Sequence, residues 1–86
     1  MAPPPLSTAT AAFGARIRAH RQQLGYTQEL LAHHAGLHWT FIGQVERGRR
    51  NVTLHNILKL AAALKVNPAV LVDGLEPPPS TAAGTE

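Results

Sequence analysis

Cysteine is absent from this sequence of 86 residues, and aromatic residues are scarce, with one tryptophan, one tyrosine and two phenylalanines. Without thiols, the chain can form no disulfide framework, no thiolate metal site and no cysteine nucleophile. It also lacks a run of about 20 apolar residues, the length that a membrane-spanning helix needs. Its amino terminus does not show the charged and then apolar pattern of a secretory signal. These absences favour a soluble intracellular protein that does not associate with membranes.

Acidic residues are rare in the central part of the chain. All eight Lys and Arg residues lie between Phe13 and Val72, where only Glu29 and Glu46 oppose them, so this segment carries a net charge of +6. Such a charge favours an anionic partner, and nucleic acid is the foremost one because binding releases counterions from its phosphates. A basic surface that only keeps the protein soluble is the alternative.

The sequence offers no set of catalytic or metal-binding residues. A nucleophile, a base and an orienting group do not occur together, and there is no glycine-rich phosphate loop, so we expect no enzyme activity. Five histidines are present, but Gly36 separates His34 from His38, and no cysteine or nearby carboxylate completes a ligand set. We therefore expect no metal and no cofactor. A domain of this size encloses no roomy cavity, so a small-molecule effector is not expected either.

Proline and small polar residues concentrate at the two ends of the chain. Residues 1–9 and 76–86 contain almost no large apolar side chain, so burial cannot offset the entropy of ordering their backbone. We predict a flexible tail at each end and one domain over residues 10–75. Apolar residues in this domain recur every three or four positions and never alternate, which predicts an all-α fold.

Five helices are predicted, and they form a compact bundle. Cap residues and glycines set their boundaries: Gly25 ends the first, Thr27 and Gly36 enclose the second, Gly48 follows the third over 38–46, Thr53 begins the fourth, and Asn67 with Pro68 begins the fifth. The inward sides of the last two helices are predicted to comprise Leu54, Ile57, Leu58, Ala61 and Leu64, followed by Val70 and Leu71.

The second and third predicted helices have the spacing of a helix-turn-helix. Both are short, and the turn between them contains Gly36, whose left-handed conformation lets the two helices cross steeply. The same spacing also occurs in other helical bundles, so it does not by itself establish DNA binding.

One long run of the chain, Arg18 to Leu71, combines several motifs. Arg21 precedes LGYTQ, the second helix contains LA and AG, the third continues into IGQVERGRR, and the fourth contains LHNILKLAAALKV. Together these motifs resemble the phage-repressor/Cro type of helix-turn-helix domain, the xenobiotic-response-element family of bacterial regulators. The segment ERGRRNVTLHNI is similar to that of restriction-modification controller proteins, which are small members of this family.

The resemblance implies a sequence-specific transcription regulator that binds double-stranded DNA as a homodimer, in the bacterial cytoplasm and associated with the nucleoid. Its recognition helix, residues 38–46, would enter the major groove of a two-fold symmetric operator with half-sites about 34 Å apart. The structural ion pair of the family corresponds to Arg21 and Glu46. The rival function is that of an antitoxin-type protein that binds a partner protein as well as DNA, but the segment EPPPSTAAGTE is poor in apolar anchors.

The side of the third helix that faces away from Ile42 and Val45 is expected to contact DNA. Base contacts are expected from three residues on this side: Trp39 against a thymine methyl group, Gln44 on the N6 and N7 edge of adenine, and Thr40. Backbone contacts are expected from residues in and around the helix-turn-helix: Gln28, His38, Gly43, Arg47, Arg49, Arg50 and Asn51.

Trp39 and Gly43 have a common explanation in this prediction. Trp39 covers apolar groups in the groove, and Gly43, one turn later, leaves room for the close approach of DNA. The alternative is that Trp39 folds back over the second helix as a partly buried staple. Three residues depart from the family pattern: His38 replaces Ser or Thr, Leu30 replaces Glu, and Phe41 replaces Tyr.

A dimer interface is predicted around the fifth helix, because apolar residues there exceed what a small monomer covers by itself. Its predicted residues are Val66, Val70, Leu71 and Leu75. The alternative is that these four side chains only close the core of the monomer.

Overall fold

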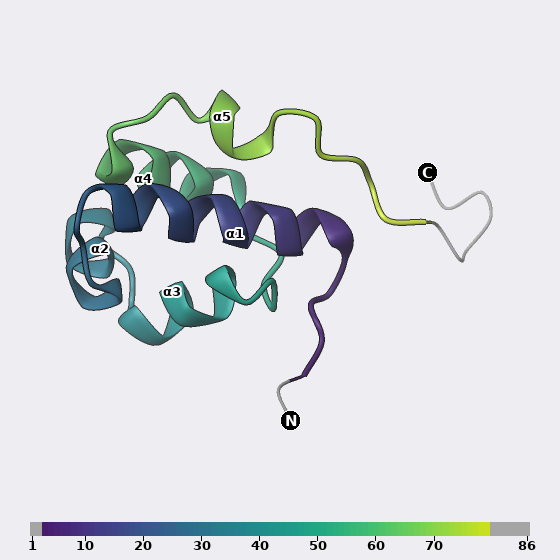
Figure 1. Ribbon diagram of the computed structural model, residues 1–86, viewed down its shortest axis with the longest axis horizontal. Helices are drawn as coiled ribbons and strands as arrows, with labels where there is room; N and C mark the ends of the chain where they lie inside the picture. Colours follow the sequence, from purple (N-terminus) through teal and green to yellow (C-terminus); the bar gives the residue numbers. More distant parts are fainter. Residues whose placement is uncertain (1–2, 80–86) are drawn as a thin grey trace.

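The computed structural model describes residues 3–79, and this part of the chain contains five helices joined by turns and loops. They are α1 (Thr8–Gln23), α2 (Gln28–Ala35), α3 (Trp39–Glu46), α4 (Leu54–Leu64) and α5 (Ala69–Val72) (Figure 1). The predicted all-α class is confirmed, and no strand occurs within residues 3–79. None of these helices has the length and apolar character needed to cross a membrane.

Local capping explains where the middle helices begin and end. Thr27 Oγ1 accepts a hydrogen bond from the Leu30 N–H at 3.0 Å, and Thr53 Oγ1 accepts one from the Asn56 N–H at 3.2 Å. Gly36 ends α2 with a φ of 69°, a left-handed conformation that favours glycine. These boundaries are the ones predicted from the sequence, because each depends on residues within one helical turn.

The start of α1 differs from the prediction. Ser7 Oγ accepts a hydrogen bond from the Thr10 N–H at 3.0 Å, and Thr10 Oγ1 accepts one from the Ser7 N–H at 3.0 Å. This reciprocal capping box makes Thr8 and Ala9 helical, so the predicted flexible tail over residues 1–9 extends too far. Of the predicted tail over residues 76–86, residues 80–86 lie outside the described residues.

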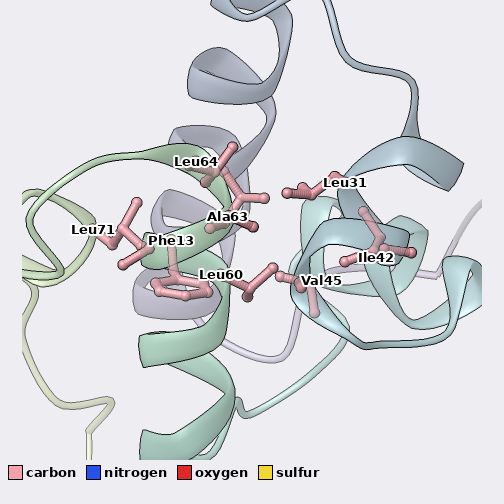
Figure 2. Packing of buried hydrophobic residues seen from close by; sticks show 12 residues of the cluster. Phe13, Leu31, Ile42, Val45, Leu60, Ala63, Leu64 and Leu71 are labelled. Carbon is pink, nitrogen blue, oxygen red and sulfur yellow. The ribbon is translucent and has the colours of Figure 1, made fainter.

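A single apolar core connects all five helices. Its largest fully buried side chains are Ile17, Leu31, Ile42, Val45, Leu60 and Leu71. In the view of Figure 2, Phe13 and Leu71 lie at one end of this cluster, Leu31 and Ile42 lie at the other, and Leu60 lies between them. The inward side of α3 therefore belongs to the core, and its opposite side lies outside the core.

The predicted inward side of α4 is partly wrong. Leu54 is 67% exposed and Leu58 is 44% exposed, whereas Leu60 and Ala63 are buried in the core. The apolar stripe of α4 is wider than the surface that α1 and α2 cover, so the packing direction decides which part of the stripe is buried. Two leucines one turn apart are thereby left in solvent.

Gly14 brings the backbones of α1 and α3 into direct contact. A Cβ atom at this buried position would lie 2.1 Å from the Val45 carbonyl oxygen and 2.8 Å from that of Glu46. Only glycine leaves room for this approach. The contact fixes the carboxyl end of α3 against the middle of α1.

Candidate nucleic-acid interface

The α2–turn–α3 unit presents one exposed side of α3 to solvent. Ile42 and Val45 hold the other side in the core. Trp39, at the first position of α3, is 52% exposed and does not belong to the core. Trp39 thus lies outside the core, with about half of its surface open to solvent.

His38 caps α3 through a ring nitrogen. His38 Nδ1 accepts a hydrogen bond from the Thr40 N–H at 3.2 Å and lies 2.7 Å from Thr40 Oγ1. The His38 ring stacks on the Trp39 ring, with centroids 6.0 Å apart and planes inclined by 25°. Histidine therefore takes the place of the hydroxyl cap expected from the family resemblance and also stacks on the exposed indole. As a result, α3 starts at Trp39, one residue later than predicted.

A bidentate ion pair connects α1 to the end of α3. Arg21 Nε donates to Glu46 Oε2 at 2.6 Å, and Arg21 Nη2 donates to Glu46 Oε1 at 3.0 Å, while Nη1 donates to the Tyr26 carbonyl at 2.8 Å. The two side chains are only 12% and 4% exposed. The hydrogen bond to Glu46 raises the pKa of the Arg21 guanidinium; burial opposes this, and the charge of Glu46 adds to it. The pair implied by the family resemblance is present.

Gln28 and Gly43 are positioned differently from the prediction. Gln28 Nε2 donates to Glu46 Oε1 at 3.1 Å, so this amide joins the ion pair instead of pointing to solvent. Gly43 is buried, and a Cβ atom there would lie 3.3 Å from Arg47 Nη1 and 3.6 Å from Gln28 Oε1. The expected backbone contact of Gly43 with DNA is therefore corrected, because the Arg47 and Gln28 side chains occupy the space beside it.

A basic hollow lies where α1, α2 and α3 meet. Its lining comprises Arg18, Arg21, Gln28, Gly43, Glu46 and Arg47. Glu46 is bound to Arg21, which leaves the charges of Arg18 and Arg47 without an acidic partner in this hollow. Arg18 was not among the predicted site residues, although it lies three residues before Arg21 and so shares its side of α1. The charges of Arg18 and Arg47 favour an anionic group here, and Gln28, the first residue of α2, also lines the hollow.

The N-terminal segment packs against the turn that follows α3. The Leu6 N–H and Thr10 Oγ1 both donate to the Gly48 carbonyl, each at 2.8 Å. A Cβ atom on Gly48 would lie 2.8 Å from Pro5 Cβ and 2.9 Å from Ala11 Cα. In Figure 1 this segment runs from the start of α1 past the carboxyl end of α3. Residues 4–6, predicted to be part of a tail, thus support the loop beside the exposed side of α3.

Arg49 and Arg50 point in different directions from this loop. Arg49 Nη1 donates to the Pro4 carbonyl of the N-terminal segment. Arg50 Nε donates to Gln44 Oε1 at 2.6 Å, and its guanidinium lies over the Phe41 ring, 5.5 Å from the centroid. Both were expected to follow the DNA backbone, but Arg50 is in contact with two residues of α3 itself.

One residue of the predicted dimer interface is corrected, and two others are half-buried in the monomer. Leu71 is fully buried in the core and is not available to a second copy. Val66 and Leu75 are half-buried and pack against the same core. Val70 is 43% exposed, as is expected of an interface residue, and is not inward as predicted for this helix. The short α5 turns only one residue into the core because it has a single helical turn.

The sequence is similar to a helix-turn-helix family and to a control protein of that kind. A family profile described as Helix-turn-helix matches residues 17–71, which include the whole α2–turn–α3 unit. The control protein C.BamHI of Bacillus amyloliquefaciens is 45% identical over 62 residues, which cover 71% of this chain and 76% of that protein.

Two solved structures have the same arrangement of helices. The restriction-modification controller protein C.AhdI from Aeromonas hydrophila is 50% identical, with a TM-score of 0.71 over 72% of this chain and 94% of that one. The biofilm regulator SinR, solved in complex with DNA, is 31% identical, with a TM-score of 0.69 over 71% of this chain and 98% of that one.

Proposed function

Because the chain belongs to the helix-turn-helix family matched over residues 17–71, we propose that it is a transcription regulator that binds a specific operator through α3. The observation that carries the proposal is the exposed side of α3, held in place by a buried ion pair and surrounded by arginines. An α-helix fits the major groove, where each base pair presents a distinct set of donors and acceptors. DNA is therefore the partner that this surface suits.

In this proposal one group of side chains contacts the bases and another contacts the DNA backbone. Trp39, Thr40 and Gln44, on the exposed side of α3, contact base edges. The backbone of DNA is contacted by residues at the margin of this side: Arg18, Gln28, His38, Arg47, Arg49 and Asn51. Arg18 is added to the predicted set because it lines the basic hollow. Gln28 stays in the set because the backbone N–H groups at the start of α2 can bind a phosphate.

The protein acts as a homodimer in this proposal. One α3 covers a single half-site, and two copies related by a two-fold axis cover a symmetric operator. The exposed apolar residues of α4 and α5 support an interface there: Leu54, Leu58, Val70 and Val72. The similarity to C.BamHI and C.AhdI supports the narrower proposal that the target genes belong to a restriction-modification system. The site of action is the bacterial cytoplasm, with the nucleoid DNA.

Selection from a random DNA pool tests the function directly. We expect the purified protein to enrich one sequence with two related half-sites about one helical turn apart. The emission of Trp39, which is the only indole in the chain and is half exposed, should change when this DNA is added. Binding should weaken steeply with salt, because phosphate contacts release counterions. The absence of an enriched sequence, together with an unchanged indole emission, would contradict the proposal.

The dimer is tested by placing a charge on α4. Leu58→Glu should give a monomer in sedimentation velocity, and it should weaken operator binding roughly 100-fold, because two linked half-site contacts lose their high effective concentration. Leu24→Glu is the matched control, since Leu24 is a similarly exposed leucine at the end of α1. If Leu58→Glu remains a dimer, as Leu24→Glu is expected to, the interface does not include this side of α4.

A further inference from the structure

Arg50 and Gln44 form a direct contact on the exposed side of α3. Arg50 Nε donates to Gln44 Oε1 at 2.6 Å, a short distance for a hydrogen bond with a charged donor. The Arg50 guanidinium also lies over Phe41, 5.5 Å from the ring centroid. Phe41 is half-buried and packs against the core, so it offers a fixed platform for the guanidinium. Arg50 is thereby held in place from two sides.

This contact distinguishes the two ends of the Gln44 amide. A free glutamine side chain can rotate its amide and present either the oxygen or the NH₂ group to a given atom. Beside Arg50, the rotated amide would place its NH₂ group against the guanidinium donor and leave both without an acceptor. The oxygen is therefore fixed toward Arg50, and the NH₂ group is directed to the remaining side.

We propose that Arg50 is a specificity-determining residue, which positions the Gln44 amide so that its NH₂ group meets a hydrogen-bond acceptor in the major groove. The inference rests on the proposed function, since it concerns the same side of α3. Guanine, adenine and thymine each present an acceptor on this edge, whereas cytosine presents only its N4 amino donor. Cytosine is then the base most strongly rejected at the position that Gln44 contacts.

This role differs from the phosphate contact that the sequence predicted for Arg50. A phosphate contact adds affinity for every sequence and increases the salt dependence of binding. A positioning residue instead changes the preference at a single base pair, and its effect disappears when the residue that it positions is removed. The two roles therefore give opposite results in one set of measurements.

The test uses the full chain and the operator obtained by selection. Gln44→Ala first identifies the base pair whose preference depends on Gln44. Four operators are then made that differ only at this base pair. The wild-type protein should bind the cytosine operator roughly fivefold or more weakly than the best one. Arg50→Ala and Arg50→Lys should both bring the four affinities within about twofold of one another, because lysine cannot hold the same geometry. In the Gln44→Ala background, Arg50→Ala should not alter the preference further.

A second measurement needs no DNA. In the free protein, Arg50→Ala should shift the NMR signals of the Gln44 side-chain NH₂ group, while thermal unfolding stays unchanged because Arg50 is exposed. If Arg50→Ala weakens all four operators equally, lowers the salt slope by about one, and is rescued by Arg50→Lys, Arg50 is a phosphate contact and the inference is wrong. If the wild-type protein selects no operator at all, the proposed function itself fails.

Discussion

Replacing Glu46 by alanine is expected to destabilise the domain by roughly 3–5 kcal/mol and to abolish operator binding, because it leaves the Arg21 guanidinium in the interior without its partner. Glu46 is 4% exposed and accepts hydrogen bonds from both Arg21 and Gln28. A small domain is stable by only about 5–15 kcal/mol, so a loss of this size is a large part of the total. Removal of the carboxylate also removes the side-chain link between α1 and the carboxyl end of α3.

The cost of this substitution should not depend on pH near neutrality. The pKa of Arg21 is raised in the folded protein, so the stability that its charge contributes is present below the unfolded pKa and is lost only in strongly alkaline solution. Thermal unfolding and operator affinity measure the effect. Glu29→Ala is the matched control, since it removes the same charge from an exposed position of α2. If Glu46→Ala unfolds at the same temperature as Glu29→Ala and binds equally well, the ion pair has no structural role.

Replacing Gly14 by alanine is expected to have a similarly large effect, through backbone contact and not charge. The added Cβ would lie 2.1 Å from the Val45 carbonyl oxygen, so α1 and α3 must separate by about 1 Å to relieve the overlap. Overpacking typically costs about 1–3 kcal/mol and occasionally more. Since the overlap here is with backbone atoms that cannot move aside, the cost should exceed the gain of about 1 kcal/mol in helix propensity. The displaced α3 should also lose its fit to the operator.

Gly43→Ala is the matched control for this prediction. Gly43 is also buried in a helix, but its nearest neighbours would be the flexible ends of Arg47, at 3.3 Å, and Gln28, at 3.6 Å. These side chains can move aside, so Gly43→Ala should change the free energy of unfolding by less than about 1 kcal/mol. Chemical denaturation of both variants gives the comparison. Equal stability of the two variants would show that α1 and α3 do not approach as closely as described.

Much of the candidate site was accessible from the sequence. The motifs of the family resemblance indicated α3 as the recognition helix, and the exposed position of Trp39 agrees with the periodicity of Ile42 and Val45. The contact of Arg50 with Gln44 was not accessible, because no pattern shows which way a loop arginine points. Arg18 was missed for a related reason, since its role depends on how α1 meets α2 and α3.

The sequence by itself determined the features that depend on neighbouring residues. Caps such as Thr27 and Thr53 and the left-handed Gly36 act within one turn, so both boundaries of α2 and the start of α4 follow from local hydrogen bonding and local sterics. The all-α class follows equally from the spacing of apolar residues, because a period near 3.6 can bury one side of a helix and no side of a strand.

Only the tertiary structure decided the features that depend on distant residues. Leu58 is exposed and Leu60 is buried although both are leucines of α4, because the direction in which α4 packs on α1 and α2 selects one part of its apolar stripe. The Leu6–Gly48 hydrogen bond makes a proline-rich segment part of the structure. Composition predicts the entropy that such a segment loses on ordering, but it cannot reveal the partner, 42 positions away, that compensates for it.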